Sequence, residues 1–301
     1  MTSAPPLSAM AAEAATQPAD WITVAARAGE VEPVLRKGLR VAVLGCGTSW
    51  FMAQAFAGLR EGAGQGVTEA FAASERRLDR GFHAVVLISR SGTTSEVIET
   101  LDEVQRLGLP HLAIVATPGT PIAERAQHAV LLPEVDERSV VQTRFATSTL
   151  ALLRAHLGED ITPIADQAAA VLAESEDDAL GALPDAEQTT FLGRGWSIGL
   201  AHEAALKLRE STQSWSESYP AMDYRHGPIS IAAPGRTVWA MGEVPPGLAD
   251  EIRSTGAAFE HREIDPMAEL VRVHRLCLTR AARRGMDPDA PRNLTRSIIL
   301  S

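Results

Sequence analysis

Four hydroxyl side chains surround a single glycine in the segment SRSGTTSE, residues 89–96. The segment directly follows an apolar run and directly precedes a helical pattern. Hydroxyls, a flexible glycine and the free backbone N–H groups at a helix start can together bind an anion without a lysine. A helix N-cap needs only one such hydroxyl. The segment therefore favours a phosphate site over a simple cap.

The segment CGTSW, residues 46–50, is a second turn between an apolar run and a helical pattern. Its glycine allows close backbone approach, and Thr48 and Ser49 add donors. Alone, the segment is equally typical of a plain turn. Both turns follow strands of the same predicted sheet, and open α/β sheets bind ligands beyond the carboxyl ends of their strands. The first turn therefore supports the interpretation of the second turn as part of a ligand-binding site.

The helical segment HEAALKLRE places Glu203, Lys207 and Glu210 on one polar stripe. The default interpretation of such a stripe is a ladder of surface ion pairs. The composition argues against it here, because the 28 basic residues are 26 arginines and only two lysines, Lys37 and Lys207. A surface ion pair accepts arginine equally well. We therefore expect Lys207 to lie where a slender, compact ammonium is required.

The segment YPAMDYRHGP, residues 219–228, contains a histidine that is predicted to lie in a turn. His226 follows an arginine and precedes Gly-Pro, so it is not on the apolar face of a helix. A loop histidine is usually a solvated one. A functional histidine here would serve in acid–base or ring-opening catalysis near neutral pH.

Short apolar runs alternate with helical stretches, which predicts the elements that position these residues. In the first half, strands are expected at 39–45, 67–72, 83–89, 111–117 and 128–133, with helices at 50–61, 93–107 and 141–157. In the second half, strands are expected at 188–194, 236–242 and 258–264, with helices at 197–213, 246–255 and 267–284. This rhythm is typical of parallel sheets covered by helices on both faces.

The pattern predicts an α/β protein with two lobes. Residues 1–37 form an N-terminal tail and two short helices interrupted near Pro18, with residues 1–9 expected to be disordered. Residues 38–165 form the first domain. Residues 187–301 form the second domain and a C-terminal tail. Glycine-rich turns at 45–49 and 193–197 suggest an internal duplication.

Composition excludes several classes of protein. The net charge of −10 gives no support to a general phosphate-backbone surface, so we expect no nucleic acid partner. No apolar run approaches the ~20 residues of a membrane span, and no charged start of a secretory signal precedes Arg27. Cys46 and Cys277 lie far apart and suggest neither a disulfide nor a zinc site. We expect a soluble, cytoplasmic protein with no metal and no cofactor.

Taken together, the motifs resemble the double sugar isomerase (SIS) domain proteins. The resemblance runs from about Met10 to Ser301, and the closest comparison is the isomerase half of the glutamine-dependent glucosamine-6-phosphate synthases. It implies two SIS lobes, each a parallel sheet flanked by helices, and a homodimer with active sites near the subunit interface. The motifs that carry it are GCGTSW, SRSGTTSE, SVVQTRF, HEAALKLRES, ESYPAMDYRHGP and DPDAPRNLTRSI.

The resemblance also implies roles for particular residues. Glu210 takes the place of the carboxylate that moves the C2 proton, Lys207 falls on the family's helix lysine, and His226 on a ring-opening histidine donated by the neighbouring subunit. The implied substrate-binding residues are Thr48, Ser49, Ser89, Arg90, Ser91, Thr94, Val140 through its backbone, and Glu203.

Three departures from the synthases narrow the expected reaction. We expect no N-terminal amidotransferase domain, and therefore no use of glutamine as the nitrogen source. Arg90 stands where the comparison has glutamine and places a positive charge beside the expected phosphate. Arg296 stands at the position of a lysine that forms an imine with the sugar. A guanidinium cannot form a Schiff base, so covalent carbonyl chemistry is lost there.

Proton abstraction from C2 of a ring-opened hexosamine 6-phosphate can lead to elimination, to deamination or to aldose–ketose isomerisation. Because elimination needs no imine, we expect a lyase that removes water from N-acetylglucosamine 6-phosphate, and Arg296 then contributes only a charged hydrogen bond. One alternative is a glucosamine-6-phosphate deaminase or an aldose–ketose isomerase. The other is a phosphosugar sensor without catalytic activity.

Overall fold

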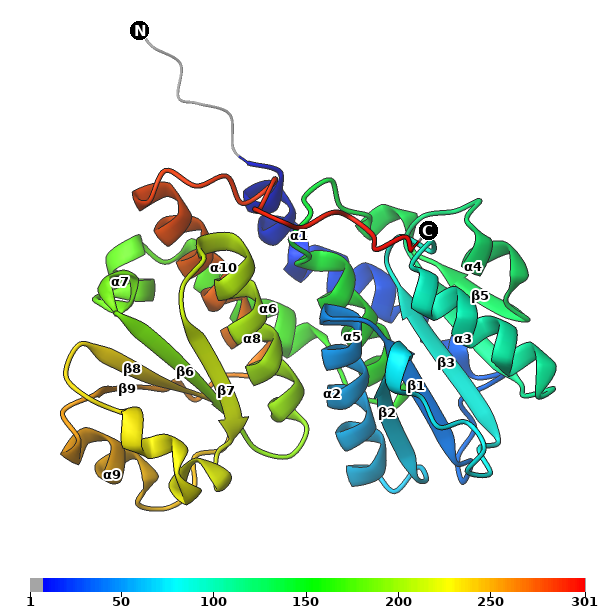
Figure 1. Cartoon of the computed structure of the whole chain (residues 1–301), viewed down its shortest axis with the longest axis horizontal. Coiled ribbons are helices and arrows are strands. Elements are labelled where there is room, and N and C mark those ends of the chain that lie inside the picture. Colours follow the sequence, from blue (N-terminus) through cyan, green and yellow to red (C-terminus); the bar gives the residue numbers. More distant parts are fainter. Residues whose placement is uncertain (1–7, 301) are drawn as a thin grey trace, which may run out of the picture.

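The computed structural model describes residues 8–300, which form two parallel sheets with helices around them (Figure 1). Sheet A has the strand order β2-β1-β3-β4-β5 and sheet B the order β7-β6-β8-β9. Sheet A consists of β1 (Val41–Gly45), β2 (Thr68–Ala72), β3 (Ala84–Ser89), β4 (His111–Val115) and β5 (His128–Leu131). Sheet B consists of β6 (Gln188–Gly193), β7 (Ser216–Pro220), β8 (Arg236–Met241) and β9 (Ala258–Glu260). Two α/β lobes with parallel, SIS-like sheets are thereby confirmed.

Helices cover both faces of sheet A because its strands are apolar on both faces. Every residue of β1 and β3 is buried. Val43 packs in one core with α2 (Thr48–Gly62) and α5 (Arg144–His156), while Leu44 packs in the opposite core with α3 (Ser95–Arg106). The short helix α4 (Pro121–Arg125) lies on the α3 side. The strand pattern therefore fixes which turn residues face the edge of the sheet.

Sheet B is built in the same way. The helices α8 (Ser197–Thr212) and α10 (Pro266–Arg283) share a core with one face, whereas α9 (Leu248–Ser254) packs on the other. Two further helices, α6 (Thr162–Ala173) and α7 (Glu176–Leu180), connect the lobes. The first four strands of sheet A and the four strands of sheet B have the same spatial order, in agreement with the suggested duplication.

The expected helix break at Pro18 is wrong, since α1 (Ala9–Ala25) runs through it. A proline lacks the N–H that would bond the carbonyl four residues earlier. Here the side-chain amide of Gln17 donates to that carbonyl, on Ala14, at 3.0 Å. The helix also begins at Ala9 with Ser8 as its N-cap, so part of the segment expected to be disordered is ordered; residues 1–7 lie outside the described residues.

Every other strand and helix expected from the sequence is present, with ends that differ by a few residues. The edge strand β7 was not predicted, because its sequence SESYP lacks an apolar run. It forms by parallel pairing with β6. The division into segments 1–37, 38–165 and 187–301 remains a prediction, and α1 packs in one core with residues of both lobes.

The two lobes meet where α2 crosses α8, and two glycines allow the close approach. A Cβ on Gly199 would overlap the backbone of α2 at the carbonyl of Phe51 and lie 2.8 Å from the nitrogen of Ala55. A Cβ on Gly58 would lie 2.9 Å from Cα of Trp196. Backbone therefore packs directly on backbone at this crossing.

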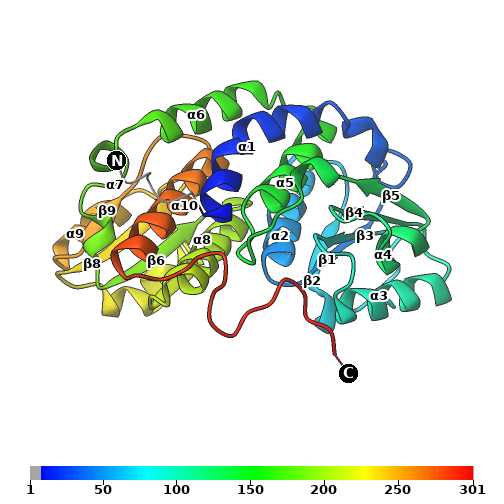
Figure 2. The same cartoon turned by 90° about the horizontal axis from the view of Figure 1, so that it is seen from above.

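After α10 the chain returns from the second lobe to the first. Residues 284–300 cross above the helices at the contact between the lobes and end beside sheet A (Figures 1 and 2). None of the helices among residues 8–300 is both long and apolar enough to cross a bilayer.

We predict that Gly199→Ala destabilises the protein by about 3 kcal/mol, because a buried backbone contact must separate to admit the methyl group. Urea unfolding followed by circular dichroism measures this change. Gly62→Ala is the matched control, since that glycine ends α2 and a Cβ added there would meet nothing within 4 Å. Its stability should stay level or rise by up to about 1 kcal/mol. Equal effects of the two substitutions would contradict the close-packed crossing.

Candidate active site

The two hydroxyl-bearing turns lie at the point where the strand order of sheet A reverses. The chain moves from β1 outward to β2 and then returns to β3 on the other side of β1. The turns after β1 and β3 therefore diverge to helices on opposite faces and leave a crevice between them. This is the position at which open α/β sheets bind ligands.

A cavity of about 180 Å³, here called the main cavity, opens at this crevice. A smaller inner recess continues from it into the turn after β3. The main cavity is lined by Cys46, Gly47, Thr48, Arg90, Thr94, Val140, Gln142, Lys207, Glu210 and the tail residues Leu294 to Ile298. The inner recess is lined by Cys46, Ser49, Ile88, Ser89, Arg90, Ser91, Thr94, Val97, Gln142 and Arg296.

The turn after β3 is held in one conformation by its own hydroxyls. Ser89 Oγ accepts a hydrogen bond from the backbone N–H of Gly92 at 3.2 Å. Gly92 has a φ of 65°, and a Cβ there would overlap the side chain of Thr120. Only glycine fits at this position, so the backbone can curl around the space at the start of α3.

The C-terminal tail lies directly on this turn. Ser297 Oγ is within hydrogen-bond distance of the hydroxyls of Ser91, Thr93 and Thr94, at 3.2, 3.0 and 3.3 Å. The carbonyl of Ile298 accepts from the N–H of Ser95 at 3.1 Å. One hydroxyl of the tail thus makes the contacts with the turn that an oxygen of a bound anion would make.

Arg90 points into the protein, where it binds carbonyl groups. Its guanidinium donates to the carbonyls of Ser139, Val140 and Arg296 at 2.8, 3.3 and 3.2 Å, and Glu137 lies at 3.6 Å. Burial lowers the pKa of Arg90, and the carboxylate of Glu137 opposes that shift. Arg90 lines the cavity, yet it also joins the loop at residues 139–140 to the tail.

Arg296 also lines the main cavity, but its guanidinium is turned toward the ends of β4 and β5. It pairs with Asp136 and donates to the carbonyl of Glu137 and to Thr117 Oγ1. Arg296 stands where the synthases that the sequence resembles have an imine-forming lysine. It therefore places a permanently charged group with an acidic partner at that position.

The polar stripe of α8 is buried and does not form a surface ladder. The side chains of Lys207 and Glu203 are 1% and 2% exposed, and Lys207 Nζ lies 3.4 Å from Glu203 and 2.6 Å from Glu210. Thr48 Oγ1, at the start of α2, donates to Glu203 at 3.2 Å. Glu203 therefore lies beneath the main cavity, while Lys207 and Glu210 line it.

Burial and the neighbouring charges shift the pKa values of Glu203 and Lys207 on α8. Burial raises the pKa of Glu203 to about 7, and Lys207 and Thr48 act in the opposite direction. Burial alone would lower the pKa of Lys207, but the neighbouring carboxylates outweigh it and the pKa lies above its usual value. Lys207 is therefore an ammonium near neutral pH, and it holds the carboxylate of Glu210 at the cavity wall.

His226 is the one expected site residue that the fold keeps apart from the rest within this chain. It ends the 3₁₀ turn Asp223–His226, and its side chain is exposed. It lines neither the main cavity nor the inner recess. Its expected origin in a neighbouring subunit remains a prediction.

The sequence reasoning overlooked two polar residues of the site. Gln142 lines both the main cavity and the inner recess, and its Oε1 is buried without a partner among the described residues. Ser297, in the C-terminal tail, contacts the hydroxyls of the turn after β3. Both residues lie within motifs that carried the resemblance, so their position in those motifs was the available signal.

In the second lobe, the turn after β6, which corresponds to the turn after β1, is closed. Ser197, after β6, donates from its Oγ to the carbonyl of Met241 at 2.7 Å and accepts from the N–H of Arg194 at 2.9 Å. These bonds join the ends of β6 and β8 directly. The described residues therefore offer the open crevice in the first lobe and a sealed one in the second.

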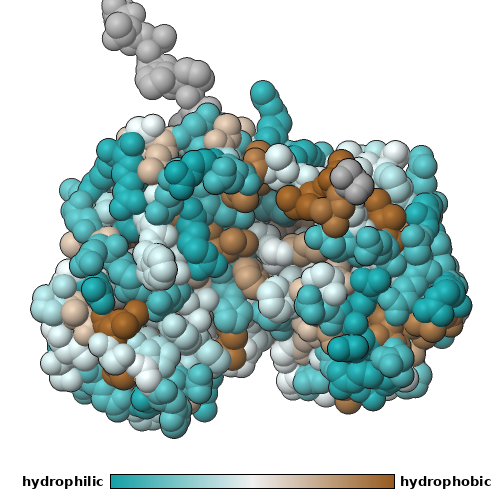
Figure 3. Space-filling model, in the orientation of Figure 1, coloured by the Kyte–Doolittle hydropathy of each residue, from teal (hydrophilic) through white to brown (hydrophobic). Residues whose placement is uncertain are grey.

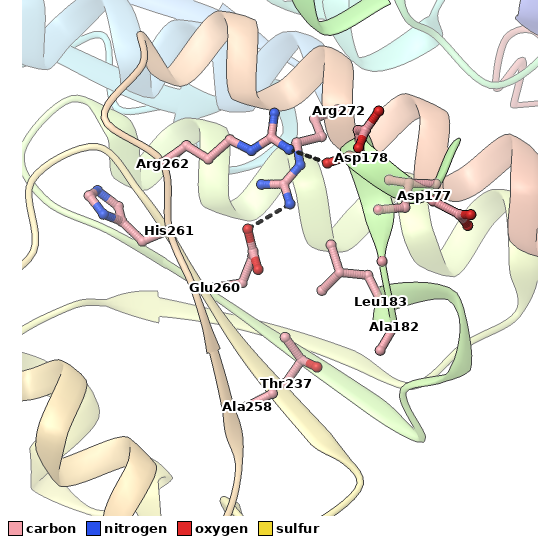
Figure 4. A pocket seen from close by; sticks show the side chains of 12 residues that line it. Asp177, Asp178, Ala182, Leu183, Thr237, Ala258, Glu260, His261, Arg262 and Arg272 are labelled. Carbon is pink, nitrogen blue, oxygen red and sulfur yellow. Dashed lines mark hydrogen bonds and ion pairs between the residues drawn. The ribbon is translucent and has the colours of Figure 1, made fainter. Parts of the chain in front are cut away.

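Another cavity, of about 400 Å³, lies beside the edge strand β9 (Figure 4). Its cations already have partners: Arg272 pairs with Glu260 at 2.6 Å and Glu269 at 2.8 Å, and Arg262 donates to the carbonyl of Asp178 at 2.7 Å. The arrangement offers no unused positive charge to a phosphate.

Residues 34–157 match the family model of the SIS domain. The glutamine–fructose-6-phosphate aminotransferase of Lactococcus lactis is 25% identical over 71% of this chain and 43% of the relative. The enzyme of the same name from Bacillus subtilis is 26% identical over 90% of this chain and 53% of the relative. The chain thus spans about half the length of these curated relatives, and the match to the SIS domain lies in its first lobe.

Solved structures resemble the whole chain. A glucosamine-6-phosphate deaminase from Thermotoga maritima superposes with a TM-score of 0.82 at 22% identity, covering 97% of this chain and all of that one. A tagatose-6-phosphate ketose/aldose isomerase from Escherichia coli gives 0.81 at 19% identity, covering 99% of both chains. At these identities the likeness establishes the fold of both lobes.

We predict that Lys207→Met destabilises the protein by about 3–5 kcal/mol, because it leaves carboxylates buried without their ammonium. Urea unfolding at pH 8 measures the loss. Lys37→Met is the matched control, since it removes the only other lysine of the chain at an exposed position. Its effect should stay within about 0.5 kcal/mol. A comparable loss from both variants would show that Lys207 has no special role in stability.

Proposed function

We propose that this protein is a sugar-phosphate enzyme in which Glu210 removes the C2 proton of a ring-opened hexosamine 6-phosphate. One observation carries the proposal. The carboxylate of Glu210, held by the buried ammonium of Lys207, opens into the same cavity as the hydroxyl-rich turn after β3. A phosphate bound at the turn would direct the sugar carbons toward this carboxylate.

The phosphate would replace the contacts of Ser297 with the hydroxyls of Ser91, Thr93 and Thr94. Backbone N–H groups at the start of α3 and the positive end of that helix add to the attraction for an anion. Arg90 supports the site from behind by fixing the loop at residues 139–140.

The reaction favoured here is elimination of water from N-acetylglucosamine 6-phosphate. Glu210 takes the C2 proton, and the electron pair of that bond forms the C2–C3 double bond as the C3–O bond breaks. The leaving oxygen keeps its electron pair and accepts a proton to depart as water. The C1 carbonyl stabilises the developing enolate.

Arg296 supports elimination over chemistry that uses an imine. Its guanidinium is paired with Asp136, and a guanidinium cannot condense with a carbonyl. Elimination and proton transfer need no such bond. We also propose a cytoplasmic homodimer, in which His226 of one subunit serves ring opening in the other.

Deamination or aldose–ketose isomerisation is the second candidate. The observation that favours it is the fold, since the solved structures that superpose on the whole chain include a glucosamine-6-phosphate deaminase and a ketose/aldose isomerase. A sensor that binds the sugar phosphate without turning it over is the third candidate. It would use the hydroxyl-rich turn but would have no need of Glu210.

The first test separates the three candidates by product. Purified protein is incubated with N-acetylglucosamine 6-phosphate, glucosamine 6-phosphate or fructose 6-phosphate, and the products are identified by mass spectrometry. We expect loss of one water from the N-acetyl sugar alone. Release of ammonia from glucosamine 6-phosphate would identify the protein as a deaminase and not a lyase. Tight binding of all three sugar phosphates without turnover would establish a sensor.

The second prediction concerns the base. Glu210→Gln should lower kcat by at least about a hundredfold while leaving the dissociation constant of the substrate within about threefold, because the phosphate contacts remain. Glu263→Gln, at an exposed position in the second lobe, is the charge-matched control and should retain full activity. Full activity in Glu210→Gln would mean that another group takes the proton.

The third prediction concerns Arg296. Borohydride should not trap fructose 6-phosphate on the wild-type protein, whereas Arg296→Lys should gain a covalent sugar adduct because an amine can form an imine. Intact-protein mass spectrometry and peptide mapping locate the adduct. Arg106→Lys, at the exposed end of α3, is the control. Equal trapping on the wild-type protein would show that a different amine reacts with the sugar.

A further inference from the structure

One wall of the main cavity is a loop that has no regular structure of its own. Residues 137–142, here called the cavity loop, lie between the 3₁₀ turn Pro133–Val135 and α5 and form neither a helix nor a strand. Val140 and Gln142 of this loop line the main cavity, and Ser139 is fully buried. A buried loop needs partners from elsewhere in the chain for its backbone N–H and C=O groups.

The turn after β3 and the C-terminal tail supply some of these partners. Arg90 donates to the carbonyls of Ser139 and Val140 at 2.8 and 3.3 Å. The N–H of Val140 donates to the carbonyl of Asp289, in the tail, at 3.3 Å. The backbone N–H groups of Arg138 and Ser139 require a further acceptor.

Glu13, on α1, accepts from both of these N–H groups. Its Oε1 lies 2.5 Å from the nitrogen of Arg138, and its Oε2 lies 3.4 Å from the nitrogen of Ser139. The side chain is buried, and burial raises the pKa of Glu13, while the bonds from the two N–H groups act in the opposite direction. A carboxylate that binds two successive N–H groups fixes both peptide planes at once.

The helix that carries Glu13 is itself held on either side of this residue. Trp21, two turns further along α1, donates from its indole nitrogen to Thr147 Oγ1 of α5 at 2.9 Å. The carboxylate of Asp289 accepts from the first two backbone N–H groups of α1, at 2.6 and 2.8 Å. α1 also shares a core with α5, beside which it lies in Figure 2. Glu13 therefore has a fixed position relative to the cavity loop.

The cavity loop presents one polar atom that nothing in the described chain uses. Oε1 of Gln142 is buried and has no hydrogen-bond partner among residues 8–300, and the side chain lines both the main cavity and the inner recess. An unpaired buried oxygen raises the free energy of the folded state, and a donor on a ligand would remove that penalty. Hydroxyl and amide N–H groups of a sugar phosphate are donors of this kind.

We propose that Glu13 is a positioning residue, which holds the cavity loop in the conformation that offers Gln142 to a hydroxyl or amide N–H group of the sugar. The inference rests on the proposed function, because a sugar phosphate must occupy the main cavity. Glu13 acts through the loop, since it lines neither the main cavity nor the inner recess. It also precedes residues 34–157, which match the SIS domain, so a helix outside the matched segment contributes to the site.

The first test separates positioning from general stability. Glu13→Gln keeps the size of the side chain but leaves one acceptor oxygen for two N–H groups. Isothermal titration calorimetry in the Glu210→Gln background, where turnover does not interfere, measures the binding of N-acetylglucosamine 6-phosphate and of inorganic phosphate. We expect the affinity for the sugar phosphate to fall about tenfold and that for phosphate to change by less than about twofold, because the hydroxyl-rich turn makes no bond to Glu13.

Equal losses for the two ligands, or no loss for the sugar phosphate, would overturn the proposal. Glu32→Gln is the matched control, since it neutralises an exposed carboxylate of the same N-terminal segment. It should leave both affinities unchanged.

A double-mutant cycle tests the route through Gln142. Glu13→Gln should lower the affinity for the sugar phosphate by less than about threefold in a Gln142→Ala background, where the contact is already absent. In a Ser91→Ala background, which alters the hydroxyl-rich turn, the full loss of about tenfold should remain. Equal losses in the two backgrounds would refute the assignment.

Hydrogen exchange tests the cavity loop without any ligand. The amides of Arg138 and Ser139 should exchange slowly in the unsubstituted protein and at least about tenfold faster in Glu13→Gln. Fast exchange in the unsubstituted protein would show that the carboxylate does not hold the loop, even if the variant failed to fold. Slow exchange that Glu13→Gln leaves unchanged would contradict the proposal equally.

The outcomes also separate this inference from the proposed function. If Glu13→Gln selectively weakens the binding of N-acetylglucosamine 6-phosphate but the Glu210-containing protein turns over none of it, the lyase fails and the positioning role stands. If water is lost from this sugar phosphate but Glu13→Gln changes neither its affinity nor the exchange of the loop, the lyase stands and the positioning role fails.

Discussion

The crossing of α2 and α8 is the constraint on which the site depends. Glycines at positions 58 and 199 let the two helix backbones touch, and this brings Thr48 of one lobe to within 3.2 Å of Glu203 in the other. The side chains of Glu203 and Lys207 are almost entirely buried, so each depends on the other for charge compensation. Lys207 in turn positions Glu210. A contact between two backbones thus sets the orientation of the proposed base.

The C-terminal tail completes the candidate site. The C-terminal tail crosses from the second lobe to the first, and two arginines hold it: Arg90 by a bond to the carbonyl of Arg296, and Arg296 by its pair with Asp136 (Figure 2). The tail leaves Ile298, Ile299 and Leu300 exposed, and Figure 3 shows hydrophobic residues gathered at this end of the chain. Because Ser297 of the tail contacts the hydroxyl-rich turn, the proposed binding of a phosphate there requires these contacts to change.

The two lobes share a strand order but differ at the crevice that this order creates. In the first lobe, Ser49 of the turn after β1 lines the inner recess; in the second, Ser197 of the equivalent turn after β6 donates to the carbonyl of Met241 and closes the turn. The second lobe contributes Glu203, Lys207 and Glu210 of α8 instead. The candidate site therefore lies between a lobe that carries the proposed phosphate-binding turn and a lobe that supplies the proposed base, as a duplicated fold permits.

The sequence by itself determined the two lobes, most of their strands and helices and most residues of the candidate site, because buried parallel strands and hydroxyl-rich turns leave strong local patterns. The rarity of lysine also predicted that Lys207 has a special environment. Only the tertiary structure decided that the stripe of α8 is buried, that Arg90 and Arg296 bind carbonyl and carboxylate groups of the protein, and that His226 lies apart from the cavity. Those outcomes depend on contacts between residues distant in the chain, which local spacing does not encode.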